Sequence, residues 1–195
     1  MTTKEKLLAL LEDSKGTFFS GEEIARTLQV SRAAVWKAVS ALREDGYTID
    51  AATNKGYRLS PDSDILSPQG IRRFLKPEYR DLDLTVLPTA PSTNALVREK
   101  ANQGCPEGCV IVACEQTDGR GRYGRQFFSP VDSGVYLSLL LRPTAYSPQQ
   151  ATCLTAAAAA AMCQAIEAVT GQQPGIKWVN DIFLHGKKVC GILTE

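Results

Sequence analysis

Serine and glycine mark helix ends at short intervals in the first sixty residues, and this spacing leaves few folds open. Ser20 precedes the amphipathic run Gly21–Leu28 and can cap it. Ser31 stands three residues after that run and can cap a second one, Arg32–Arg43, which Gly46 terminates. Two helices joined by so short a connection form a helix-turn-helix.

A further helix and a hairpin complete this part of the chain. Residues 4–11 repeat leucine and alanine on one helical face. Residues 47–50 and 56–59 alternate apolar and polar side chains like strands, and the turn Asn54-Lys55-Gly56 lies between them. The sequence therefore predicts three helices and a two-stranded wing.

The basic residues of this winged helix indicate what it binds. The second helix of such a motif can enter the major groove of DNA. We expect the residues at its start, Ser31, Arg32 and Ala33, to meet base edges, and Lys37 and Lys55 to meet phosphates. The alternative is a three-helix packing module that makes protein contacts and binds no DNA.

A polar, proline-containing stretch at 60–64 separates two unlike parts, and we predict domains at 1–62 and 66–195. The second part mixes helices and strands. Helices are expected at 67–75, 92–102 and 147–169, the last with Ser147 as its cap. Strands are expected at 82–86, 108–114, 134–142, 176–184 and 187–194. We predict an α+β fold with one mixed, largely antiparallel sheet.

The segment Gly119–Arg125 holds three glycines and three arginines between two apolar strand-like runs. Glycine lets the backbone approach a ligand closely, and arginine offers a fixed fork of donors that suits carboxylate and phosphate. The segment is therefore a candidate to close over an anion. A flexible, solvated basic loop without a ligand is the alternative.

His185-Gly186 has the pattern of a two-residue hairpin turn. The register would then be Leu184 opposite Lys187, Phe183 opposite Lys188, and Asp181 opposite Cys190. In that register Lys177, Asp181 and Lys188 share one face of the strands. The two lysines could neutralise a reacting phosphate or carboxylate. An exposed edge hairpin with its charges in water is the alternative.

The composition excludes several classes. The chain has 195 residues, a net charge of +1, six cysteines and one histidine. It has no CxxC pair, which argues against zinc, and we expect no metal held by the protein alone. Gln149, Gln150, Gln164 and Glu167 bracket the alanine run 156–161 too closely for a membrane span. With no visible signal peptide, the cysteines indicate reduced thiols in the cytoplasm.

The order and spacing of several short motifs resemble the bifunctional biotin protein ligases that also act as biotin operon repressors. The resemblance covers essentially the whole chain. Its motifs are Ser31–Lys37, Pro91–Asn94, Gln116, Gly119–Arg125, Lys177–Asp181 and Lys188–Leu193.

The resemblance implies a catalytic domain of the class II aminoacyl-tRNA-synthetase and biotin-ligase type. Members of the family continue past the position of Glu195 with more strands, an adenylate-covering loop and a small barrel, so we expect an incomplete domain. It also implies a reaction: biotin and Mg-ATP give biotinyl-5′-AMP, and a lysine of biotin carboxyl carrier protein then takes the biotin.

The resemblance also implies roles for individual residues. Arg122 and Lys188 are the expected catalytic residues. The expected biotin contacts are Ser92, Thr93, Asn94, Gln116, Arg120, Gly121, Arg122 and Lys188. The expected ATP or adenylate side comprises Gly119, Lys177, Trp178, Asn180 and Asp181.

The resemblance further implies regulation: the adenylate-bound protein would form a homodimer and bind operator DNA through its winged helices. Two alternatives remain at this point. One is a winged-helix transcription factor that senses a small molecule without ligase activity, and the other is a lipoate-type ligase. The Gly/Arg segment 119–125 together with Lys188 argues against the first, because sensing biotin alone would not need a phosphate clamp.

Overall fold

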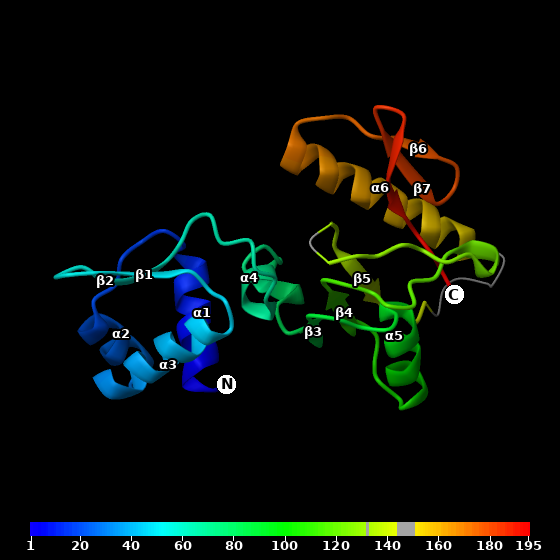
Figure 1. Ribbon diagram of the computed structural model, residues 1–195. Coiled ribbons are helices and arrows are strands. Elements are labelled where there is room, and N and C mark those ends of the chain that lie inside the picture. The colour runs from blue at the N-terminus through cyan, green and yellow to red at the C-terminus, as the bar shows by residue number, and fades with distance from the viewer. Residues whose placement is uncertain (132, 144–150) are drawn as a thin grey trace. The chain divides into compact units, whose positions relative to one another are not determined.

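The computed structural model describes residues 1–131, 133–143 and 151–195, and of 151 and 152 only the backbone. The described chain forms two compact units, Met1–Val86 and Leu87–Glu195 (Figure 1). The segment 66–86, which the sequence analysis assigned to the second domain, groups with the first unit. The domain limits 1–62 and 66–195 stay a prediction.

The first unit contains the expected winged helix-turn-helix. Its elements are α1 (Thr3–Asp13), α2 (Gly21–Leu28), α3 (Arg32–Glu44), β1 (Ile49–Ala52) and β2 (Gly56–Leu59). Ser20 and Ser31 cap α2 and α3 by accepting from backbone N–H groups, as predicted. Gln29, in the left-handed region at φ 54°, turns the chain between those helices. The wing pairs Ile49 with Leu59 at its base.

One hydrophobic core joins the three helices to the wing. It is built of buried side chains: Leu7, Leu8, Leu11, Ile24, Val35, Ala38, Val39, Leu42, Tyr47, Ile49 and Leu59. Full burial of one such side chain contributes roughly 1.5–3 kcal/mol. The helical periodicity of the sequence predicts Val35, Val39 and Leu42 of α3 inward, and this part of the core is confirmed.

After the wing, α4 (Pro68–Arg72) packs against α1. The short helix η1 (Pro77–Tyr79) follows α4 in the chain. The carboxylate of Glu12 on α1 is buried, and Arg73 lies 3.7 Å from it. Burial of one charge without a partner would be costly, so the pair fixes α4 on α1.

The described chain after the wing forms two three-stranded sheets, where the sequence analysis expected one, and the first of these sheets begins with the last residues of the first unit. The first sheet has the order β3-β4-β5, with β3 (Leu84–Leu87), β4 (Val110–Ala113) and β5 (Tyr136–Leu139). Helix α5 (Thr93–Asn102) packs on β4 and β5. The second sheet has the order β6-β7-β8, with β6 (Gly175–Lys177), β7 (Asp181–Leu184) and β8 (Lys187–Gly191).

Two predictions for the second sheet were wrong. The expected strand 176–184 is two strands, because a turn at 178–180 reverses the chain between β6 and β7. The expected pairing of Asp181 with Cys190 is also wrong: a register shift after Phe183 opposite Lys188 pairs Ile182 with Cys190 and Asp181 with Gly191. A β-bulge adds one residue to one strand and so moves every later pair.

Helix α6 (Ala151–Thr170) packs on β6 and β7. The expected Ser147 cap lies outside the described residues. By length and composition alone, Cys153–Thr170 could cross a membrane, with a mean hydropathy of 1.4. One such helix is weak evidence for a membrane-spanning segment, and the expectation of no membrane partner stays a prediction.

Candidate functional site

A cluster of hydrogen-bonded polar side chains lies where α5 begins in the second unit. The Gln116 carbonyl oxygen accepts from the Thr93 backbone N–H at 2.8 Å and from the Thr93 hydroxyl at 3.1 Å. The Gln116 amide donates to Ser129 at 3.2 Å. The Ser138 hydroxyl lies 2.8 Å from the Thr93 hydroxyl and also contacts the Asn94 side-chain oxygen.

The backbone brings these residues together from distant parts of the chain. Gln116 forms a parallel bridge with Ala90 and an antiparallel bridge with Ser129. Ser92 is buried and its side chain caps α5, and Thr93, Ser129 and Ser138 are buried too. The cluster therefore offers hydroxyl and amide groups that are already oriented by one another, as recognition of a polar, uncharged ligand group requires.

The sequence analysis identified Ser92, Thr93, Asn94 and Gln116 but missed Ser129 and Ser138. A signal for Ser138 existed: it is a lone polar residue in the run Val135–Leu141, on the face of β5 opposite to Leu137 and Leu139. A buried hydroxyl needs a partner, and that partner lies 45 residues away in sequence.

Asn94 links this cluster to the chain after β8. Its amide lies 3.4 Å from the Leu193 carbonyl and 3.0 Å from the Glu195 carboxylate. Arg98, one turn further along α5, lies 2.6 Å from the same carboxylate. The hydrogen bond from Asn94, and then the contact with Arg98, lower the pKa of Glu195.

The Gly/Arg segment forms a tight hairpin. The backbone N–H of Gly121 donates to the Arg125 carbonyl at 2.7 Å, and that of Phe127 donates to the Gly119 carbonyl at 2.8 Å. At the tip is the short helix η2 (Arg122–Gly124), where Tyr123 has a φ of 60° and is exposed. The loop is thus self-bonded along its backbone, with its arginine side chains directed outward.

Gly119 lies against the polar cluster. A Cβ atom at this position would lie 2.3 Å from the Phe127 carbonyl and 2.5 Å from the Ser129 hydroxyl. The sequence analysis placed Gly119 on the nucleotide side, whereas its nearest side chains here are Ser129 and Gln116 of the expected biotin side.

Three of the four charged residues of the second sheet, Lys177, Asp181 and Lys188, lie near one another. Lys188 Nζ lies 2.8 Å from the Asp181 carboxylate, and its ammonium lies 5.8 Å from the Phe127 ring centre. Lys177 pairs with Asp181 across β6 and β7, and its ammonium lies 5.6 Å from the Phe183 ring. Lys188 thus reaches Asp181 with its side chain, although the register shift places Gly191 opposite that aspartate.

Arg122 reaches from the loop tip to the second sheet. Its guanidinium donates to the Asn180 side-chain oxygen at 3.0 Å and to the Tyr123 hydroxyl at 3.2 Å. A pocket of about 280 Å³ adjoins it, close to the lower size for small-molecule sites. Its lining is Arg122, Thr155, Val179, Asn180, Ile192, Leu193, Thr194 and Glu195.

The other expected residues are less enclosed. Arg120 pairs with Asp118 at 2.9 Å, and Trp178 is exposed. Asp118, Asp181 and Glu195 are each ion-paired to a basic side chain. In the described part of this site, these acids do not form a set of free carboxylates that fits a directly bound Mg²⁺.

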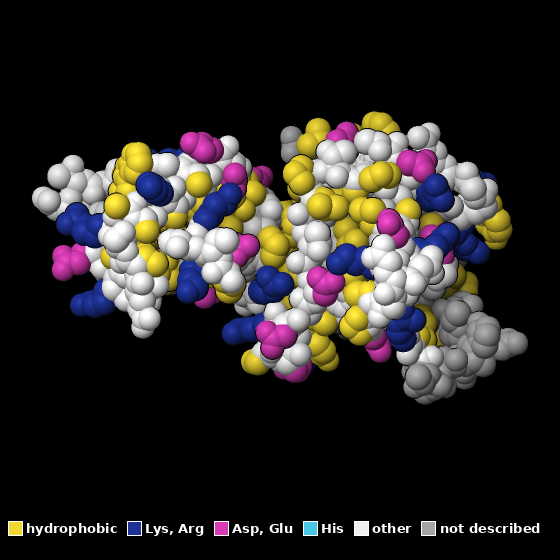
Figure 2. Space-filling model, turned by 90° about the horizontal axis from the view of Figure 1, so that it is seen from below, with side chains coloured by type: hydrophobic (Ala, Val, Ile, Leu, Met, Phe, Trp, Pro, Cys, Tyr) yellow, Lys and Arg dark blue, Asp and Glu magenta, His cyan; other side chains and the backbone are white. Residues whose placement is uncertain are grey.

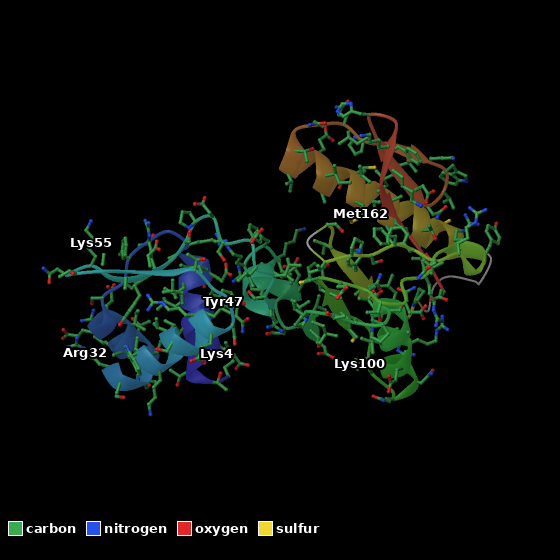
Figure 3. The ribbon with its side chains drawn as sticks, in the orientation of Figure 1. Lys4, Arg32, Tyr47, Lys55, Lys100 and Met162 are labelled. Atoms are coloured by element: carbon green, nitrogen blue, oxygen red, sulfur yellow. The ribbon has the colours of Figure 1, made fainter. Side chains whose placement is uncertain are left out.

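A groove in the first unit lies between α3 and the wing. Its volume is about 730 Å³, and Arg32 and Ala33 line it with Asn54 of the wing turn. Lys55 projects at the wing tip and Arg32 at the start of α3, both away from the buried Tyr47 (Figure 3). Lys37 is exposed but does not line this groove.

Basic and acidic side chains are interspersed over the face shown in Figure 2, where hydrophobic side chains also reach the surface of the second unit. Bulk charge therefore gives no strong preference for a polyanion, in agreement with the net charge of +1. Recognition of DNA by the first unit would depend on the local arrangement in the groove.

The fold and these two sites define a class of proteins that join a winged helix-turn-helix to an α+β domain with a small-molecule site. The chain belongs to the biotin/lipoate A/B protein ligase family, whose model matches residues 86–195. A helix-turn-helix domain model matches residues 3–58.

Relatives confirm the resemblance inferred from the motifs. The chain is 43% identical over 194 residues to the bifunctional ligase/repressor BirA of Bacillus subtilis (strain 168), with 100% of this chain and 59% of that protein covered. It is 33% identical over 194 residues to the protein of that name from Escherichia coli (strain K12), with 100% and 58% covered. The chain thus spans less than two thirds of the length of these relatives.

Among solved structures, the chain is similar to a biotin protein ligase from Aquifex aeolicus in complex with biotin and ATP. That comparison has 32% identity, covers 58% of this chain and 46% of the other, and gives a TM-score of 0.49.

Proposed function

We propose that this chain supplies the DNA-binding unit and most of the biotin site of a biotin protein ligase that also represses the biotin operon. The observation that carries the proposal is the group of polar residues at the α5 start, beside the Gly/Arg loop, within the segment that matches the ligase family. The names of the Bacillus and Escherichia relatives support both activities.

The proposed reaction has two steps. The biotin carboxylate attacks the α-phosphorus of ATP, a P–O bond forms, and pyrophosphate leaves. The ε-amine of a lysine in the biotin carboxyl carrier protein then attacks the acyl carbon of the adenylate, and AMP leaves. Mg²⁺ would accompany ATP through its phosphates, since the acids of the site are already ion-paired.

Lys188 and Arg122 are the proposed catalytic residues. Both are cationic side chains with a partner on β7 or in the turn before it, Asp181 for Lys188 and Asn180 for Arg122. A fixed positive charge aimed at the acyl phosphate stabilises the negative charge that develops there in both steps. Arg120 and Gly121 belong to the same loop and would cover the ligand.

The polar cluster is proposed to hold the biotin head. Hydroxyl and amide groups suit a ureido ring, which both donates and accepts hydrogen bonds, and Ser92, Thr93, Asn94 and Gln116 supply them. The nucleotide side would use the second sheet, through Lys177, Trp178, Asn180 and Asp181. The proposed role of Gly119 is steric: because it has no side chain, the loop can lie against Gln116 and Ser129.

The first unit is proposed to bind operator DNA when the adenylate is bound, as part of a homodimer in the cytoplasm. The helix-turn-helix match and the groove between α3 and the wing support the DNA-binding part. Ordering of the Gly/Arg loop around the adenylate would couple the two sites.

Calorimetric titration of biotin into the purified chain tests the proposal most directly. We expect saturable binding that weakens at least tenfold in Gln116→Ala, which removes an acceptor and a donor of the cluster. Gln103→Ala is the matched control, because Gln103 is exposed and bonds only to Glu99 of its own helix. A folded chain that binds lipoate but not biotin would instead favour the lipoate-type ligase.

A second experiment separates a ligase from a sensor without ligase activity. In the full-length protein, Arg122→Ala is expected to release biotinyl-5′-AMP at least tenfold faster while the far-ultraviolet circular dichroism spectrum stays unchanged. Equal release from the two proteins would contradict the role of Arg122. Failure to form any adenylate from biotin and ATP would favour the sensor.

A further inference from the structure

Trp36 is an exposed aromatic side chain in the middle of α3. Within the winged-helix segment 2–60, which is fully described, it is the only large hydrophobic side chain with high exposure, at 61%. Its neighbours Val35, Ala38 and Val39 are buried in the core. Packing of the unit therefore does not explain a tryptophan at this position.

The direction of Trp36 is fixed by the helix. It follows Arg32 by four residues and Ala33 by three, so the three side chains lie on one face of α3. All three line the groove of about 730 Å³ between α3 and the wing, together with Tyr57. Lone exposed hydrophobic residues are common on proteins, so the position in the groove carries more weight than the exposure itself.

The residues that line the groove suit contact with a polyanion. No acidic residue is among those that line it, all of which lie in the fully described segment 20–57, and Arg32 is at its rim. The first turn of α3 has no acidic residue, whereas that of α2 has Glu22 and Glu23. The positive end of the α3 dipole is therefore not neutralised by its own side chains. The small residues Ala33, Ala51 and Gly56 leave room for the edge of a base to enter the groove.

We propose that Trp36 reads DNA sequence, its indole packing against the C5-methyl group of a thymine in the major groove. The inference rests on the DNA-binding part of the proposed function and adds a specificity-determining residue to it. Thymine alone among the bases presents an apolar group in that groove, and apolar side chains recognise it by contact. In this arrangement Arg32, for which the sequence analysis expected a base edge, would meet a phosphate as Lys55 would, and phosphate contacts carry no sequence information.

The test uses the full chain with biotin and ATP, and a duplex selected by it from a random library. Each thymine of that duplex is replaced in turn by deoxyuridine, which removes only the methyl group. One replacement is expected to weaken binding by the wild-type chain about fourfold, the factor for one methyl-sized group removed from contact. Trp36→Ala is expected to bind more weakly and to lose this sensitivity, whereas Trp36→Phe keeps most of it.

Salt dependence supplies a second measurement. Trp36→Ala should leave the slope of log K against log salt unchanged, while Arg32→Gln should reduce that slope by about one contact. Tyr79→Ala is the control, because Tyr79 is an exposed aromatic of the same unit that does not line the groove. It should change neither quantity.

Two outcomes would overturn the inference in different ways. If Trp36→Ala keeps the wild-type sensitivity to deoxyuridine, or if the wild-type chain has none, Trp36 does not read a thymine methyl, although the chain binds DNA. If the wild-type chain selects no duplex at all, the DNA-binding part of the proposed function fails, and this inference fails with it.

Discussion

Two constraints act on single residues of the candidate site: the space around the backbone and the hydrogen bonds of the side chains. The sequence shows each of them only in part. The glycines of Gly119–Arg125 were visible as a pattern, but the pattern does not say which glycine is required. Only Gly119 has backbone and side-chain atoms so close that a methyl group would overlap them, whereas Gly124 has open space. The partners of Ser138 and Gln116 come from other segments and could not be read from their neighbours in sequence.

Gly119→Ala is expected to weaken biotin binding at least tenfold in calorimetry. The added methyl would lie 2.3 Å from the Phe127 carbonyl, so the loop must move away from Gln116 and Ser129. Overpacking of this kind costs about 1–3 kcal/mol. Gly175→Ala is the matched control, since a methyl group there meets nothing within 4 Å. Unchanged affinity in Gly119→Ala would show that the loop geometry is not needed for the ligand.

Ser138→Ala is expected to raise the dissociation constant for biotin threefold to tenfold and to lower stability by about 1 kcal/mol. The substitution removes the hydroxyl that orients Thr93 and Asn94 without touching the loop. Ser133→Ala is the control, because its exposed hydroxyl bonds only near its own turn. Equal affinities for the two variants would indicate that Thr93 needs no orienting partner.

At the level of elements, helices were easier to predict than strands. The helices α2, α3 and α5 each begin directly after a capping serine. Such starts can be predicted because a cap acts within three or four residues of sequence. Strand pairing depends on a partner elsewhere in the chain. The bulge between β7 and β8 changed the partners of Asp181 and Cys190, although the turn at His185-Gly186 was where the sequence predicted it.

The wing should depend on Gly56. This residue has a φ of +94°, and a Cβ atom would lie 2.0 Å from the Phe19 carbonyl, with which β2 forms an isolated bridge through Tyr57. Gly56→Ala is expected to reduce DNA affinity at least tenfold in gel-shift assays and to leave biotin binding unchanged. Gly16→Ala is the control: its φ is also positive, at +85°, but its Cβ would lie at an ordinary 3.7 Å from Pro61. That variant should lose only about 1–2 kcal/mol from backbone strain and keep the wing.

At the level of the whole chain, each unit has its own buried side chains, so a change of pH can affect the stability of the two units separately. The first unit buries Tyr47 and Glu12, whereas the second buries the neutral hydroxyls of Ser92, Thr93, Ser129 and Ser138. Tyr47 is a group in the core of the first unit that titrates at alkaline pH.

Burial, followed by the nearby Glu12 and Asp45 carboxylates, raises the pKa of Tyr47 above its ordinary value of about 10. The folded state then holds this proton more tightly than the unfolded state does. The stabilisation is complete below about pH 10 and is lost as the pH rises through the folded-state pKa. Urea unfolding on either side of that pH should show a smaller loss for Tyr47→Phe than for the wild-type chain. Tyr79→Phe, at an exposed site, should behave as the wild type does; an equal loss in all three would contradict the assignment.

The sequence by itself determined the helices, their caps, the winged helix-turn-helix and the identity of most candidate residues. These features depend on spacings of two to four residues, which a chain keeps in any surroundings. Tertiary structure decided which distant residues meet: Thr93 with Gln116 and Ser138, and Arg122 with Asn180. Those contacts close over long stretches of chain and depend on how the segments assemble, which short-range patterns do not encode.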